Sequence, residues 1–191
     1  MNFSLKTGQA VSITEEKEGI AEQVLWVVGF AVATVLAARV EIPHYPVPYT
    51  LQTLMVLLSG AILGARNGAL SQVLYLTAGL VGLPVFSGGG MGLVRILGPT
   101  GGYLLAFPFA AALVGYLVHQ RKDLLWMYIS MAAGLLVIFL SGTAQLYAVL
   151  FHNWSDAFQN GFLIFSWWDL LKLTAAAMIS FEVLKRKKPI E

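Results

Sequence analysis

Two oppositely charged residues, Asp169 and Lys172, lie within the otherwise apolar stretch "WWDLLKLTAAAM" near the end of the chain. Residues three apart share one face of a helix, so the carboxylate and the ammonium group are expected side by side. In a bilayer each charge costs about 2.5–3.5 kcal/mol to insert and needs a partner inside the protein. The pair is therefore either a structural ion pair, with Lys172 reaching toward the interface, or a pair of ligand-binding groups. The second interpretation is favoured, because ionisable groups at membrane depth are functional by default.

A glycine-rich segment, "GLPVFSGGGMGLVRILGPTGGY" at 82–103, supplies a second type of binding chemistry. Its closely spaced glycines disfavour a helix, and its single charge is Arg95. Pro99 suits the first turn of a following helix, whose free N–H groups attract anions. Arg95 and this helix start together suit a carboxylate. The alternative is a plain connector, although long loops without structure of their own are uncommon unless they are functional.

Amide and aromatic side chains complete the candidate site. Gln52 and Gln145 can each donate and accept hydrogen bonds, while Phe86, Tyr103 and one tryptophan can flank a ring. Tryptophan is also common in the interfacial belts of membrane proteins, and the other aromatic rings can be packing residues. The expected substrate-binding set is Asp169, Lys172, Arg95, Gln52, Tyr103, Gly89, Phe86, Gln145 and Trp168.

The composition places this chemistry in a membrane. Of the 191 residues, 58% are hydrophobic and only 12% are charged, and the mean hydropathy is +0.74. Soluble domains carry roughly twice that charged fraction. The chain has no cysteine, which excludes disulfides and thiolate metal sites. Its three histidines lie in or beside predicted loops without metal-ligand spacing, so we expect no metal and no catalytic residue.

Six apolar stretches predict an all-α integral membrane protein with six transmembrane helices. The expected helices are at about 21–40, 50–64, 67–83, 99–119, 124–151 and 161–184. Most Lys and Arg residues fall in the two tails and in two of the connections, and placing them in the cytoplasm gives an N-in, C-in orientation. The expected organisation is a cytoplasmic tail at 1–20, a membrane domain at 21–185 and a basic cytoplasmic tail at 186–191.

This orientation gathers the polar residues of the predicted helices in the outer third of the membrane. Thr50, Gln52 and Thr53 begin the second helix there, and Asp169 and Lys172 begin the sixth. On the first helix, Ala33 and Ala37 form a face of small residues. Such faces let helices approach closely in lipid, so this one either packs within the chain or docks on another membrane subunit.

Four motifs carry a resemblance to a known family. "PVPYTLQT" at 46–53, "GLPVFSGGGMG" at 82–92, "GPTGGY" at 98–103 and "WDLLK" at 168–172 resemble the BioY family, the biotin-specific S components of energy-coupling-factor transporters. The resemblance extends from about residue 21 to 185. It implies a compact six-helix S-component fold in the cell membrane, an outer ligand pocket closed by the loops between helices one and two and between three and four, and capture of biotin.

The resemblance also implies partners. These are a transmembrane coupling subunit, on which the Ala33 and Ala37 face would dock, and two ATP-binding-cassette ATPases. Biotin would be the transported ligand, with no cofactor and no catalytic activity.

The candidate residues fit biotin in one of two orientations. In the first, Asp169 accepts the ureido N–H groups, Lys172 donates to the ureido oxygen or holds Asp169, and Gln52 or Gln145 assists. Arg95 and the start of the fourth helix then face the carboxylate, and Tyr103, Phe86 and a tryptophan flank the rings. In the second orientation the carboxylate points toward Lys172.

Three other functions compete with a coupled importer. A solitary biotin facilitator would use the same binding residues without ATPases. An intramembrane serine protease would need a nucleophile and a histidine within the membrane, and no G-x-S-x-G motif is present. The third is a structural membrane protein without a ligand. The chain also lacks the G-x-x-x-x-G-K-[ST] phosphate-binding motif, so energy from ATP would have to come from partners.

Overall fold

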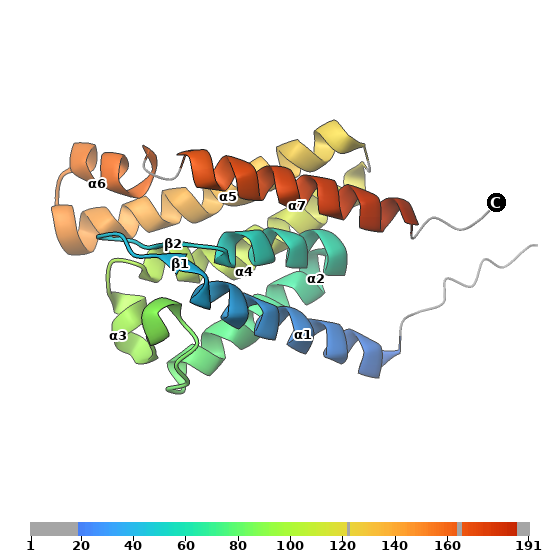
Figure 1. The fold of residues 1–191 in the computed structure, drawn as a ribbon, viewed down its shortest axis with the longest axis horizontal. Coiled ribbons are helices and arrows are strands. Elements are labelled where there is room, and N and C mark those ends of the chain that lie inside the picture. Colours follow the sequence, from blue (N-terminus) through green and yellow to red (C-terminus); the bar gives the residue numbers. More distant parts are fainter. Residues whose placement is uncertain (1–18, 122, 164–165, 187–191) are drawn as a thin grey trace, which may run out of the picture.

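The computed structural model describes residues 19–121, 123–163 and 166–186, and these form a bundle of long helices (Figure 1). The predicted tails at 1–18 and 187–191 lie outside the described residues. The elements in chain order are α1 (Ile20–Arg39), β1 (Glu41–Ile42), β2 (Tyr49–Thr50), α2 (Gln52–Leu80), η1 (Ser87–Gly89), α3 (Gly92–Leu97), α4 (Gly101–Gln120), α5 (Leu124–Leu146), η2 (Tyr147–Phe151), α6 (Trp154–Gly161) and α7 (Ser166–Arg186).

The helix α2 is a hairpin of two antiparallel halves. Gly64 interrupts it with φ 79° and ψ 175°, a conformation that glycine adopts far more readily than other residues. The halves then run back against each other, since a Cβ atom on Gly68 would lie 2.8 Å from the Cα atom of Gly60. The helices expected at 50–64 and 67–83 are thus present, joined at one glycine.

Four helical segments within the described part of the chain are long and apolar enough to cross a membrane: α1, α2, α4 and the continuous stretch Leu124–Phe151. Because α2 folds back at Gly64, it contributes two shorter segments. The number of six crossings and the N-in, C-in orientation stay predictions.

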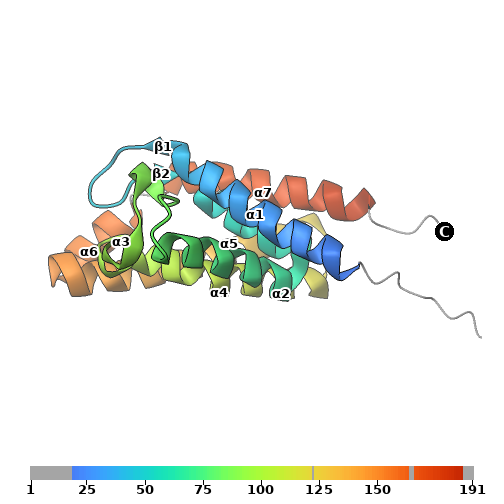
Figure 2. The ribbon, with the colours of Figure 1, turned by 90° about the horizontal axis from the view of Figure 1, so that it is seen from below.

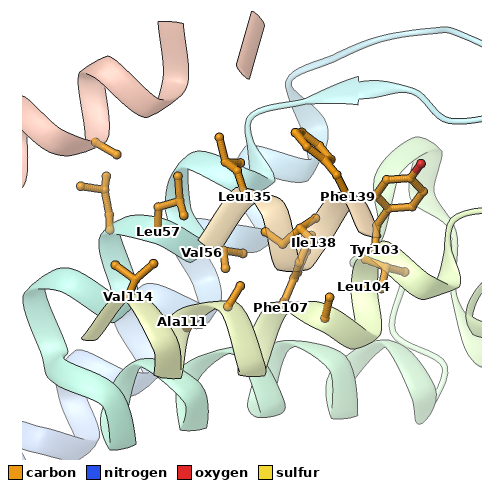
Figure 3. Packing of buried hydrophobic residues seen from close by; sticks show 14 of the residues in the cluster. Val56, Leu57, Tyr103, Leu104, Phe107, Ala111, Val114, Leu135, Ile138 and Phe139 are labelled. Carbon is orange, nitrogen blue, oxygen red and sulfur yellow. The ribbon is translucent and has the colours of Figure 1, made fainter. Parts of the chain in front are cut away.

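Small residues bring α2 and α4 into close contact. A Cβ atom on Gly60 would lie 2.3 Å from the carbonyl oxygen of Ala111, and one on Gly115 would lie 2.3 Å from the backbone nitrogen of Ala65. In lipid such contacts hold helices together by van der Waals packing. The apolar side chains of α2, α4 and α5 pack beside this contact, as Val56, Phe107 and Ile138 show (Figure 3).

A buried amide ties α1 to both halves of α2. Gln72 Nε2 lies 3.3 Å from Thr34 Oγ1 and 3.1 Å from Ser59 Oγ, and all three residues are completely buried. These bonds join three helical segments at one point.

The two ends of the bundle differ. One end carries β1, β2, α3 and α6, and the other carries the start of α1, the turn of α2 and the end of α7 (Figures 1 and 2). Two segments predicted to be loops contain short helices. Asn153 Oδ1 accepts a hydrogen bond from the Ser155 backbone and caps α6, and Ile96 anchors α3 by its burial.

The close contact between α2 and α4 predicts that adding one methyl group at Gly60 destabilises the fold. Gly60→Ala forces the two backbones apart and should lower the free energy of unfolding by about 1–3 kcal/mol. Thermal unfolding in detergent measures the change. Gly29→Ala is the matched control, since a Cβ atom on Gly29 would meet no atom of the described residues within 4 Å. Equal melting temperatures for both variants and the unaltered chain would contradict this packing.

Candidate ligand-binding site

A cavity of about 40 Å³ opens at the end of the bundle that carries β1, β2, α3 and α6. Its apolar wall comes from α4 and α5 and includes Leu104, Phe107 and Phe139 (Figure 3). Its polar lining includes Gln52, Thr53, Ser87, Thr100, Tyr103, Asp169 and Lys172. A space of this size holds only a few water molecules, so a larger ligand requires the lining segments to move apart.

Asp169 and Lys172 form the charged centre of this cavity. Lys172 Nζ lies 2.6 Å from Asp169 Oδ1, and the two residues are 5% and 3% exposed. Thr53 Oγ1 donates to the same carboxylate oxygen at 3.3 Å. Asp169 Oδ2 is buried and has no hydrogen-bond partner among the described residues. A buried polar atom without a partner is destabilising, so a ligand that reached this oxygen would stabilise the carboxylate by donating a hydrogen bond.

Lys172 also holds the β-hairpin that covers the cavity. Its Nζ atom donates to the Thr50 backbone oxygen at 3.0 Å, and Thr50 pairs with Glu41 across the hairpin. Burial, and secondarily the negative charge of Asp169, raise the pKa of the neighbouring Tyr49. The hairpin is therefore attached to the helical bundle through a charged hydrogen bond.

Gln52 and Tyr103 line the cavity while their polar atoms are engaged in the fold. Gln52 Nε2 donates to the Tyr75 hydroxyl, and Gln52 Oε1 accepts from Thr50 Oγ1 at 3.0 Å. Tyr103 donates to the Gly161 backbone oxygen at 2.7 Å and so links α4 to α6. Both side chains are therefore held in fixed positions.

Three of the residues expected in the glycine-rich segment, Arg95, Phe86 and Gly89, do not line the cavity. Arg95 Nη2 donates to the backbone and side-chain oxygens of Ser87 at 2.8 and 3.2 Å, and it is Ser87 that lines the cavity. Phe86 is completely buried, 5.5 Å from the Tyr75 ring between centroids. Gly89 lies beside the Arg39 guanidinium group, since a Cβ atom there would be 3.4 Å from Nη1. These three residues shape the segment without lining the cavity.

Gln145 and Trp168 also lie outside the cavity. Gln145 Nε2 donates to the backbone oxygens of Ile96 and Gly98 at 2.8 and 2.7 Å, which ties α5 to the connection between α3 and α4. Trp168 lines a neighbouring cavity of about 100 Å³. Thr50 and Lys172 border both cavities, so β2 separates them.

The small-residue face of α1 is partly covered by the chain itself. Ala37 is 5% exposed, Ala33 is half-buried, and Gly29 one turn earlier is exposed. Only the part of the face toward the start of α1 is open to another subunit.

Several lining residues were absent from the expected set: Thr53, Ser87, Thr100, Leu104, Phe107 and Phe139. Thr53 and Thr100 stand inside the motifs "PVPYTLQT" and "GPTGGY", which is a signal that could have identified them. Thr100 Oγ1 is buried without a hydrogen-bond partner among the described residues. Within the same part of the chain, no group of His, Cys, Asp or Glu side chains could hold a metal ion.

Known proteins resemble this chain in sequence and in fold. A curated biotin transporter BioY from Thermotoga maritima is 38% identical over 156 residues, which covers 82% of this chain and 92% of the relative. A probable biotin transporter BioY from Lysinibacillus sphaericus is 37% identical over 164 residues, with coverages of 82% and 83%. The crystal structure of the biotin S-component of an ECF-type ABC transporter matches with a TM-score of 0.80 at 23% identity, covering 86% of this chain and 92% of that one.

The family model agrees with these relatives. It is the model of the BioY family, and it matches residues 7–188. Together with the apolar helices, the match identifies a multi-pass protein of the cell membrane. The chain therefore belongs to the BioY family.

Proposed function

We propose that this chain binds biotin at the outer end of its helical bundle and is the substrate-binding subunit of a biotin importer. The observation that carries the proposal is the buried Asp169–Lys172 pair in the lining of a cavity with an apolar wall, with one carboxylate oxygen that has no hydrogen-bond partner among the described residues. A mostly apolar pocket with a few fixed polar groups suits a small ligand. The names of the curated relatives supply the identity of that ligand.

The ureido ring of biotin fits the charged centre. Asp169 Oδ2 accepts a ureido N–H, while Oδ1 stays with Lys172 and Thr53. The ammonium group of Lys172 lies beside this carboxylate and can donate to the ureido oxygen. Leu104, Phe107 and Phe139 then contact the thioether ring. Exclusion of water strengthens each of these hydrogen bonds.

The carboxylate of biotin would lie toward α4 and the glycine-rich segment. Thr100 directly precedes α4, its hydroxyl has no partner among the described residues, and the first N–H groups of the helix attract an anion. Arg95 reaches this region through Ser87. We therefore assign Arg95 an indirect role, in which it positions Ser87 and adds positive charge. The carboxylate points toward Lys172 in the alternative orientation.

Binding requires the cavity to open, and the β-hairpin is the part that can move. It is attached to α7 by the bond between Lys172 and Thr50, whereas the helices around the cavity are packed backbone to backbone. A ligand that engages Lys172 competes with that bond. The hairpin and the segment around Ser87 would close over biotin after it enters.

For transport we propose that a transmembrane coupling subunit and two ATPases supply the energy. The structural neighbour is named as an S-component of an ECF-type ABC transporter, and this chain has no phosphate-binding motif of its own. The second candidate is a facilitator that works without ATPases. Biotin uptake by vesicles containing this chain alone would favour the facilitator, and uptake only with the complete complex and ATP would favour the importer.

Replacing the acidic residue tests the binding site. Asp169→Asn should weaken biotin binding by about 10- to 100-fold, because a hydrogen bond to a buried charged group is lost. Calorimetric titration of the purified protein measures the affinity. Asp156→Asn, an exposed change on α6, is the matched control and should bind as the unaltered chain does. Equal affinity in both variants would remove Asp169 from the site.

An ester tests the position of the carboxylate. Biotin methyl ester should bind about tenfold more weakly than biotin, since it cannot make a charged hydrogen bond. Arg95→Gln should reduce this difference, and Arg121→Gln should leave it unchanged. If the difference persists in Arg95→Gln and disappears in Lys172→Met, biotin lies in the reverse orientation.

A substitution on the small-residue face of α1 tests whether the chain assembles with a coupling subunit. Ala33→Trp should leave biotin affinity unchanged and abolish co-purification with the coupling subunit, because small faces require close helix contact. Leu171→Trp, on an exposed position of α7, should assemble normally. Normal assembly of Ala33→Trp would mean that this face serves only internal packing.

A further inference from the structure

The first half of α1 is separated from α2 by an apolar groove. All buried residues of α1, namely Ala31, Thr34, Ala37 and Ala38, lie in its second half. The first half, from Ile20 to Phe30, contains none. A groove of about 650 Å³ lies between the first half of α1 and the second half of α2.

The groove has an apolar body and a polar end. Val24, Val28, Leu70 and Val73 line the body and are 42–55% exposed. Arg66 and Asn67 line the end nearest the turn at Gly64, and Gln23 and Thr77 are the other polar residues of the lining. Arg66 is exposed and forms no ion pair within the described part of the chain. This distribution matches an amphipathic molecule with an anionic head.

The length of the groove corresponds to one leaflet. On α2 it extends from Arg66 to Thr77, which is about 16 Å at 1.5 Å per residue, and on α1 from Ile20 to Val28, about 12 Å. The hydrocarbon core of a bilayer is about 30 Å thick, so one leaflet contributes about 15 Å. On α1, past Val28, the bond from Gln72 to Thr34 and the buried alanines hold the helix against α2. An acyl chain of one leaflet fits this length, whereas a helix crossing the whole bilayer would extend past it.

We propose that this groove binds one anionic phospholipid, with its phosphate on Arg66 and an acyl chain between α1 and α2. Basic sites between transmembrane helices are suited to anionic head groups. The lipid would belong to the leaflet next to the starting end of α1, where the turn of α2 also lies (Figures 1 and 2). It would fill the space that the described residues leave between these helices. The proposal does not depend on the identity of the transported ligand.

Lipid retention tests the proposal directly. The purified chain is reconstituted in vesicles containing equal amounts of phosphatidylglycerol and phosphatidylcholine with identical acyl chains. It is then re-extracted in mild detergent and examined by native mass spectrometry. The unaltered chain should retain one phosphatidylglycerol in preference to phosphatidylcholine. Arg66→Gln should reduce this preference about fivefold, the effect of one basic residue near an anionic surface.

Two controls separate the groove from the general surface. Arg121→Gln removes a cation that stacks on Trp126 outside the groove, and it should keep the preference. Leu70→Trp fills the groove and should lower retention of both lipids. Leu125→Trp changes an exposed position on α5 and should not. Gel filtration and helical circular dichroism verify folding, and if Leu70→Trp does not fold, Leu70→Phe replaces it.

Three results would overturn the proposal. The first is equal retention of both phospholipids by the unaltered chain. The second is an unchanged preference in Arg66→Gln. The third is a Leu70→Trp variant that keeps its lipid and no longer co-purifies with a coupling subunit, which would make the groove a site for a protein partner.

Discussion

The desolvation of one ion pair governs the ligand-binding end of this molecule. Asp169 and Lys172 are almost completely buried, and each would be strongly destabilising without the other. Their contacts extend to Thr53 on α2 and to the backbone of Thr50 on the hairpin. The pair thereby connects α7, α2 and the cover of the cavity. Because Asp169 Oδ2 has no partner among the described residues, this network has one acceptor left for a ligand.

Close packing of the helices makes that network rigid. Gly60 and Gly115 admit the backbones of α2 and α4 to contact distance, and Gly142 accommodates the ring of Tyr103. Close-packed protein interiors have low compressibility, so the helices of the bundle resist gradual deformation. The hairpin, in contrast, has two paired residues on each strand, and hydrogen bonds of Thr50 with Lys172 and with Gln52 attach it to the bundle. Movement needed for ligand entry should therefore concentrate in the hairpin, and the helices should keep their positions.

Much of the architecture could be predicted from the sequence, because apolar periodicity and buried charge are local properties. Most helical stretches and the proximity of Asp169, Lys172 and Gln52 to one another agree with the pattern, although the helix expected at 161–184 begins at Ser166, after α6 ends at Gly161. The roles of Arg95 and Gln145 could not be predicted, because both side chains satisfy backbone oxygens whose position depends on the folded connection. The same reason applies to Thr100, which enters the cavity wall only once α4 begins at Gly101.

The second half of α1 is packed more tightly against the bundle than its first half. Its second half is held by Gln72 and by buried alanines, and Arg39 at its end donates to the backbone oxygen of Pro84 in the segment that leads to Ser87. Its first half has no buried residue. A partner or lipid that contacts the first half therefore touches the least constrained part of the helix. Because Gln72 and Pro84 hold the second half, movement of the first half does not require movement of the end of α1 beside the ligand site.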